Sequence, residues 1–129
     1  MTALQPILIV EDDEVTAELE RRVLTRAGRV TRTVQRAAEA VELLRADSFS
    51  VVLLDYNLPD GDPWRVVEIA HARVPRVPVI IVTSASSEKI ASEALHHGVS
   101  EYVQKTEAFW IQLPQLVERR VQEVPLHRG

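Results

Sequence analysis

Residues 7–14 read ILIVEDDE, four aliphatic residues followed directly by four acidic ones. A similar order returns at residues 51–55, VVLLD, and at residues 79–83, VIIVT, where a hydroxyl stands in place of the acid. Continuous aliphatic runs rich in β-branched residues are typical of strands buried on both faces, as in parallel sheets covered by helices. The pattern therefore predicts a parallel sheet in which each of these strands ends at a polar residue.

Amphipathic segments separate these runs. Apolar spacing predicts helices over residues 14–27, 37–46, 63–74 and 87–97, and two weaker strand signals lie at residues 30–34 and 102–103. Because proline disrupts a helix interior, we expect the last helix to begin at Leu113 or Pro114 and to end near Glu123. Residues 107–112 would then form an extended connection or a short separate turn. Five β-α repeats imply a parallel sheet with helices on both faces.

The same spacing predicts which side of each helix faces the core: Ala37, Ala40, Val41 and Leu44 in the second, Val66, Val67 and Ala70 in the third, and Leu116, Val117 and Val121 in the last. In the first helix the expected inward residues are four apart, with Leu24 beside them: Val15, Leu19, Val23 and Ala27. In the fourth helix they are Ile90, Ala91, Ala94 and Leu95.

Composition excludes several classes of protein. The chain has 129 residues, no cysteine and a net charge of -4, which rules out Cys-ligated zinc, iron-sulfur clusters and thiol catalysis. The acidic balance argues against nucleic acid as the main partner, and no apolar run approaches the ~20 residues needed to cross a membrane. We expect one domain over residues 1–124, a C-terminal tail or the start of a linker at residues 125–129, and a cytoplasmic location.

Polar side chains follow four of the predicted strands. Glu11 and Asp12 follow the first, Asp55 the third, Thr83 the fourth and Lys105 the fifth. Each has an ordinary explanation by itself, as a helix-start acid, a turn aspartate, a capping hydroxyl or a solvated lysine. Together they lie where ligands bind, outside the carboxyl ends of parallel strands. Crowded carboxylates at such an edge predict a Mg²⁺ site.

The order and spacing of four motifs resemble the receiver (CheY-like) domain of bacterial response regulators in two-component signalling. The motifs are the acidic pair at residues 11–12, Asp55-x-Asn57-Leu58-Pro59, residues 78–83, and Gly98-x-x-x-Tyr102-x-x-Lys105. The resemblance implies an α/β, flavodoxin-like fold, a doubly wound (βα)5 unit with five parallel strands in the order 2-1-3-4-5. It also implies that Asp55 accepts a phosphoryl group from a sensor histidine kinase or a histidine phosphotransfer protein.

The resemblance further implies a role for each site residue. Mg²⁺ would be held by Asp12 and Asp55 directly, by Glu11 through a water, and by the backbone carbonyl of Asn57. Lys105 and Thr83 would contact the phosphoryl group, and Thr83 and Tyr102 would form the switch, although Tyr102 also fits an amphipathic core tyrosine. Asp13 would be a helix cap. Thr106 stands where relatives commonly have proline, so we expect a trans peptide bond after Lys105.

The implied output is protein contact. A downstream effector would bind the face formed by the fourth helix, fifth strand and fifth helix, where residues 109–111, Phe-Trp-Ile, could be either interface or core. We expect no enzymatic activity other than slow self-dephosphorylation, and no direct contact with nucleic acid or membrane. We expect the protein to be a monomer or a phosphorylation-dependent dimer. The chain could be a single-domain regulator or a receiver excised from a larger protein. Alternatives are a phosphorylation-independent pseudo-receiver and, less favoured, a Mg²⁺-dependent aspartyl-phosphate phosphohydrolase.

Overall fold

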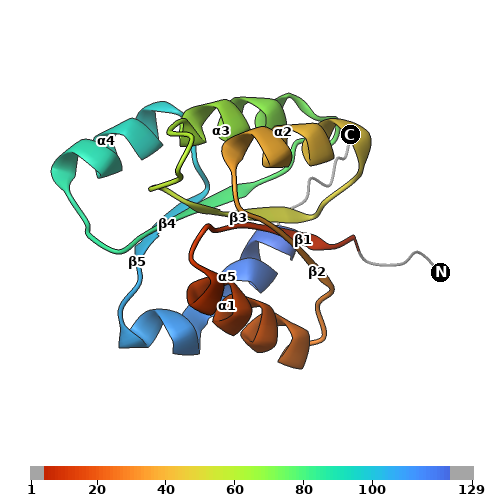
Figure 1. Cartoon of the computed structure of the whole chain (residues 1–129), viewed down its shortest axis with the longest axis vertical. Helices are drawn as coiled ribbons and strands as arrows, with labels where there is room; N and C mark the ends of the chain where they lie inside the picture. The colour runs from red at the N-terminus through yellow and green to blue at the C-terminus, as the bar shows by residue number, and fades with distance from the viewer. Residues whose placement is uncertain (1–4, 123–129) are drawn as a thin grey trace.

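The computed structural model describes residues 5–122, and within them five parallel strands form one sheet in the order β2-β1-β3-β4-β5 (Figure 1). The strands are β1 (Ile7–Val10), β2 (Thr31–Val34), β3 (Val51–Asp55), β4 (Val79–Thr83) and β5 (Glu101–Gln104). The expected fold class and strand order are confirmed. The predicted tail or linker at residues 125–129 lies outside the described residues.

The helices cover both faces of this sheet. They are α1 (Glu14–Arg26), α2 (Ala37–Ala46), α3 (Pro63–Ala72), α4 (Glu88–His96) and α5 (Glu107–Gln122). Figure 1 shows α2, α3 and α4 above the sheet and α1 and α5 below it. Among the residues that the structure describes, no helix has the length and apolar character needed to span a membrane.

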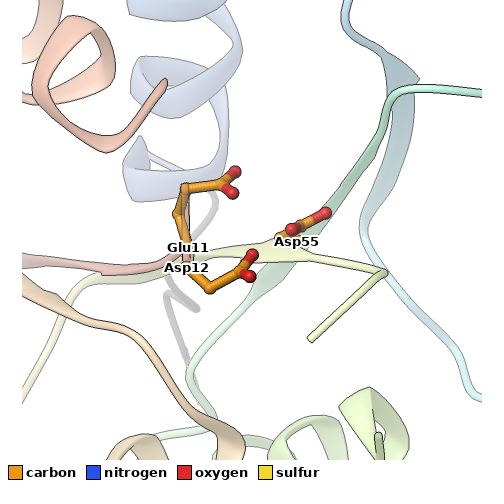
Figure 2. A group of neighbouring side chains, drawn as sticks. All are labelled: Glu11, Asp12 and Asp55. Carbon is orange, nitrogen blue, oxygen red and sulfur yellow. The ribbon is translucent and has the colours of Figure 1, made fainter. Parts of the chain in front are cut away.

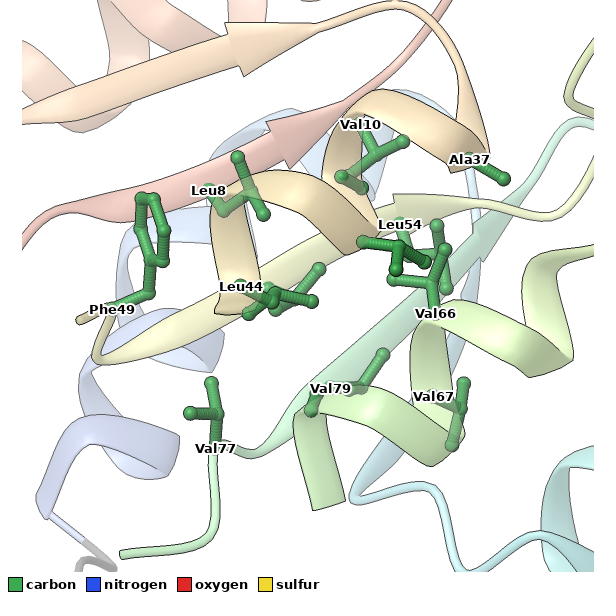
Figure 3. Packing of buried hydrophobic residues seen from close by; sticks show 14 of the residues in the cluster. Leu8, Val10, Ala37, Leu44, Phe49, Leu54, Val66, Val67, Val77 and Val79 are labelled. Atoms are coloured by element: carbon green, nitrogen blue, oxygen red, sulfur yellow. The ribbon is translucent and has the colours of Figure 1, made fainter. Parts of the chain in front are cut away.

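Two clusters of apolar side chains form the core, one on each side of the sheet. Leu8 and Val10 of β1 point to α2 and α3, where they join the cluster drawn in Figure 3. Ile7 and Ile9 point the other way, to a cluster with Phe109 and Leu113 of α5. Each such side chain contributes roughly 1.5–3 kcal/mol on burial. Burial on both faces explains why the strands are aliphatic throughout instead of alternating.

The prediction for the last helix is wrong at its start. α5 begins at Glu107, and Pro114 lies inside it. Its buried residues, Phe109, Leu113, Leu116 and Val117, follow helical spacing and pack on the sheet. Proline costs a helix interior ~3 kcal/mol, and burial of this stripe outweighs that cost. Phe109 is therefore core, Trp110 is partly buried against the same cluster, and Ile111 is 81% exposed.

The predicted inward residues of α2 and α3 are all buried, whereas the predicted inward faces of α1 and α4 are partly wrong. In α1 the buried residues are Ala17, Glu20 and Leu24, whereas Val15 and Leu19 are exposed. In α4 only Ala94 is buried, and Leu95 is 82% exposed. Both helices therefore carry apolar side chains on more than one side, and only one of those sides is covered by the core.

The peptide bond after Lys105 is trans, as expected, because the cis bond found within residues 5–122 joins Val74 to Pro75. Thr106 allows the chain to turn directly into α5, and its carbonyl accepts a hydrogen bond from the Phe109 N–H at 3.0 Å.

Candidate functional site

The carboxyl edge of the sheet brings three carboxylates together, as the sequence predicts. Glu11 and Asp12 follow β1, and Asp55 is the last residue of β3, which pairs with β1 in a register that matches Val10 with Leu54. One carboxylate oxygen from each residue lies within 4.8 Å of the others. Figure 2 shows the three side chains converging from the two strand ends. Glu11 and Asp55 are buried, and Asp12 is exposed.

Lys105 lies at the same edge and neutralises part of this charge. Its Nζ is 2.7 Å from Oε1 of Glu11, in a largely buried ion pair. The backbone N–H of Lys105 also donates to the carbonyl of Thr83 at 2.8 Å, which holds the chain at Lys105 against the end of β4. The predicted acids and lysine are therefore in one site.

Burial and neighbouring charge raise the affinity of the Asp55 carboxylate for a proton. Burial, followed by the negative charge of Glu11, raises the pKa of Asp55 to about 7, although the nearby Lys105 lowers it in part. Burial alone lowers the pKa of Lys105, but the hydrogen bond to Glu11 and the charges of Asp55 and Glu11 together raise it. One ammonium does not balance the local negative charge, so the edge has the chemistry of a divalent cation site.

The neighbouring polar residues have structural partners. Asp13 caps α1, and its Oδ2 accepts hydrogen bonds from Thr16 N–H at 2.9 Å and from the Thr16 hydroxyl at 2.6 Å. The cap predicted at Asp13 is confirmed. The Asn57 N–H donates to Oδ1 of Asp55 at 3.2 Å, which draws the chain after β3 into a tight turn beside the acids.

Thr83 and Tyr102 both contact the loop between β4 and α4. The buried Thr83 hydroxyl donates to the Ala85 carbonyl at 3.1 Å and accepts from the Ala85 N–H at 3.2 Å. The Tyr102 hydroxyl lies 3.0 Å from Oγ of Ser86 and accepts from the Ser87 N–H at 3.2 Å. The Tyr102 ring is partly buried against the core.

Glu20 is a fourth acid near this site that the sequence reasoning missed. It is 1% exposed on the inward face of α1, and its Oε1 has no hydrogen-bond partner among residues 5–122. Burial and the charge of Glu11 raise its pKa to about 8, against the opposing effect of Lys105. Its spacing from Ala17 and Leu24 is the sequence signal that could have placed it inward.

A family model described as the response regulator receiver domain matches residues 7–117. Among curated relatives, response regulator protein PilR of Pseudomonas aeruginosa is 35% identical over 101 residues, which are 78% of this chain and 23% of PilR. The chain thus spans about a quarter of the length of that relative.

Solved structures agree with the fold. The non-phosphorylated HemR receiver domain of Leptospira biflexa is 26% identical, with a TM-score of 0.77 and coverage of 97% of this chain and 98% of that one. The receiver domain of sensor histidine kinase PA1611 from Pseudomonas aeruginosa is 24% identical, with a TM-score of 0.81 and coverage of 93% and 99%. The latter is described with a magnesium ion coordinated in its active site cleft.

Proposed function

Because this chain belongs to the response regulator receiver domain family, we propose that it is a phosphoacceptor whose Asp55 takes a phosphoryl group from a histidine kinase or a histidine phosphotransfer protein. The observation that carries the proposal is the grouping of Asp55 with two further carboxylates and with Lys105 at one edge of the sheet. The combination offers a nucleophile, a cation site and a fixed positive charge in one place.

Mg²⁺ fits the donor set of this edge. Three carboxylates share a space in which their oxygens lie within 4.8 Å of one another, and their mutual repulsion favours a hard divalent cation. Asp12 and Asp55 would bind it directly, Glu11 through a water, and Asn57 through its backbone carbonyl. When bound, Mg²⁺ would neutralise charge on the transferring phosphoryl group.

Asp55 would act as the nucleophile of an in-line transfer. A carboxylate oxygen of Asp55 attacks phosphorus, and the P–N bond to the donor histidine breaks as the new P–O bond forms. Lys105 then exchanges its ion pair with Glu11 for one with a phosphoryl oxygen. Slow hydrolysis of the acyl phosphate by an in-line water would restore Asp55.

Thr83 and Tyr102 would carry the change away from Asp55. The Thr83 hydroxyl is bonded to Ala85, so reaching a phosphoryl oxygen requires it to leave this turn. Tyr102 contacts the next two residues of the same loop, so movement of the loop changes the environment of the ring. Such a switch biases an existing equilibrium between two arrangements.

The output surface in this proposal is the face formed by α4, β5 and α5. Leu95 of α4 and Ile111 of α5 are large apolar side chains exposed on these elements, which suits contact with a protein effector. Phe109 is excluded from that contact because it is buried. A cytoplasmic location, a monomer or phosphorylation-dependent dimer, and no direct contact with nucleic acid or membrane belong to the same proposal.

A phosphodonor experiment tests this function. Incubation with Mg²⁺ and acetyl phosphate should add the mass of one phosphoryl group to the wild-type protein, and chelation of Mg²⁺ should prevent it. Asp55→Asn, which replaces the nucleophilic carboxylate with an amide of similar shape, should gain nothing. Absence of the wild-type product would instead favour a pseudo-receiver, and a phosphorylated Asp55→Asn protein would show that another residue is the acceptor.

Lys105→Ala separates the chemistry from the switch. We expect this variant to keep Mg²⁺ binding, because Lys105 is not a proposed ligand, but to lose the change in Trp fluorescence that phosphorylation causes in the wild type. An unaltered fluorescence response would rule out the proposed contact between Lys105 and the phosphoryl group.

A further inference from the structure

Helix α4 is held to the rest of the molecule by very little core packing. All of its residues are described, and only Ala94 is buried, while Ala91 and Leu95 are exposed. By contrast, α2 and α3 each bury four residues against the sheet. Contacts other than core packing must therefore contribute to the position of α4.

Four side chains supply such contacts on the side of α4 that faces α3. The Tyr56 hydroxyl donates to Oε1 of Glu93 at 3.2 Å. The rings of Trp64 and His97 stack with centroids 4.5 Å apart and an interplanar angle of 7°. Tyr56 also packs edge-on against Trp64, with centroids 6.0 Å apart, so the four residues are connected. We call Tyr56, Trp64, Glu93 and His97 the Tyr56 clasp.

One end of this clasp begins at the proposed phosphoacceptor. Tyr56 directly follows Asp55, and its N–H donates to the carbonyl of Val82 at 2.9 Å, which fixes the backbone at this point against β4. The other end, Glu93 and His97, lies on the C-terminal half of α4 and on its C-cap. A shift of the chain after Asp55 therefore reaches α4 through side chains that touch, without passing through Thr83 or Tyr102.

We infer that the Tyr56 clasp holds α4 in the position that the structure shows and opposes a different arrangement that modification of Asp55 favours. This inference rests on the proposed function for its coupling to Asp55, whereas the attachment of α4 does not. Contacts that exist in only one of two arrangements shift the equilibrium toward that arrangement. They therefore lower the affinity of any ligand that prefers the other arrangement, by the factor by which they shift the equilibrium.

Tyr56→Phe tests the inference because it removes the hydroxyl and keeps the ring. Without ligand, we expect amide hydrogen exchange across Glu88–His96 to rise about 3- to 10-fold, the range for loss of one such hydrogen bond, with Ala37–Ala46 unchanged as an internal reference. The affinity for beryllofluoride in the presence of Mg²⁺, used as a mimic of the phosphoryl group, should rise by a similar factor. Glu93→Ala should reproduce both effects, and Glu93→Gln, which retains an acceptor oxygen, should largely restore wild-type behaviour.

Ala91→Gln is the matched control, because Ala91 lies on α4, is exposed and is not one of the clasp residues, and glutamine has a helix propensity close to that of alanine. It should leave exchange and affinity as in the wild type. Unchanged α4 exchange in both Tyr56→Phe and Glu93→Ala would overturn the clasp, and raised exchange with unchanged beryllofluoride affinity would overturn its coupling to Asp55. If the wild type binds no beryllofluoride, the proposed function fails, while ligand-free exchange still decides whether the clasp holds α4.

Discussion

At the scale of single residues, the site buries carboxylates whose negative charges are only partly compensated. Glu11 and Asp55 are buried carboxylates, and among residues 5–122 the ammonium of Lys105 forms an ion pair with Glu11. Glu20 adds a further buried carboxyl whose Oε1 has no hydrogen-bond partner in the described part of the chain. The edge of the sheet therefore stores electrostatic strain that a cation or a proton relieves.

Glu20 should make the protein less stable as the pH rises. Its pKa is about 8 in the folded protein, against an ordinary value of 4.5, so the folded state binds the proton more tightly and the free energy of unfolding falls between these two pH values. Glu20→Gln should match the wild type near pH 5 and exceed its free energy of unfolding at pH 8.5 by on the order of 4 kcal/mol, since one pKa unit is about 1.4 kcal/mol. Urea unfolding with a chelator present measures this.

Two features keep the Glu20 experiment specific. Asp55, whose pKa is raised to about 7 by burial and by Glu11, gives a slope of the same sign in both proteins, so the difference between them reports Glu20 together with its interaction with Asp55. Glu42→Gln, on the exposed side of α2, should leave the pH dependence unchanged. Equal slopes for wild type and Glu20→Gln would mean that Glu20 is not held as a neutral acid.

At the scale of elements, α5 shows how a local rule yields to tertiary packing. Pro114 removes one backbone donor from the helix, yet the stripe from Phe109 to Val117 is buried on the sheet. An ion pair between Arg29, which follows α1, and Glu118 also joins α5 to its neighbour. The residues before Pro114 are therefore helical because burial of their apolar face against the sheet outweighs the cost of the proline.

Pro114→Ala should stabilise the protein, because it restores the missing backbone N–H and removes the clash of the ring with the preceding turn. We expect a gain of about 1–3 kcal/mol in the free energy of unfolding, below the full cost of an interior proline because the helix has already adapted to it. Urea denaturation measures the gain. Gln115→Ala, at the adjacent exposed position, should change stability by only a few tenths of a kcal/mol. A loss of stability in Pro114→Ala would show that packing of the half-buried ring outweighs its backbone cost.

At the scale of the whole molecule, the sequence predicts the strands, the grouping of polar residues at one edge and the inward faces of α2 and α3 better than the inward faces of α1 and α4. Residues 7–10, 51–54 and 79–82 are aliphatic on both sides of each strand, and the polar residues that follow them meet because parallel strands end at one edge. The face of α1 is predicted wrongly in part, because Val15 and Leu19 repeat at the same spacing as core residues but face solvent. Glu20 was missed because a charged residue is ordinarily assigned to the exposed side. Periodicity reports how apolar residues are spaced, whereas the packing of the complete fold selects which stripe is covered.

Mg²⁺ should stabilise the whole domain, because the three carboxylates are brought together only by the folded sheet. A ligand that binds the folded state alone adds about 2.7 kcal/mol to the free energy of unfolding at a concentration 100 times its dissociation constant. Thermal unfolding with increasing Mg²⁺ should therefore show a rising Tm for the wild type and little change for Asp12→Asn. Asp13→Asn is a closely matched control, since it removes the adjacent carboxylate while asparagine still caps α1. If Asp13→Asn loses the response and Asp12→Asn keeps it, the acidic pair that holds the metal lies one residue later than assigned.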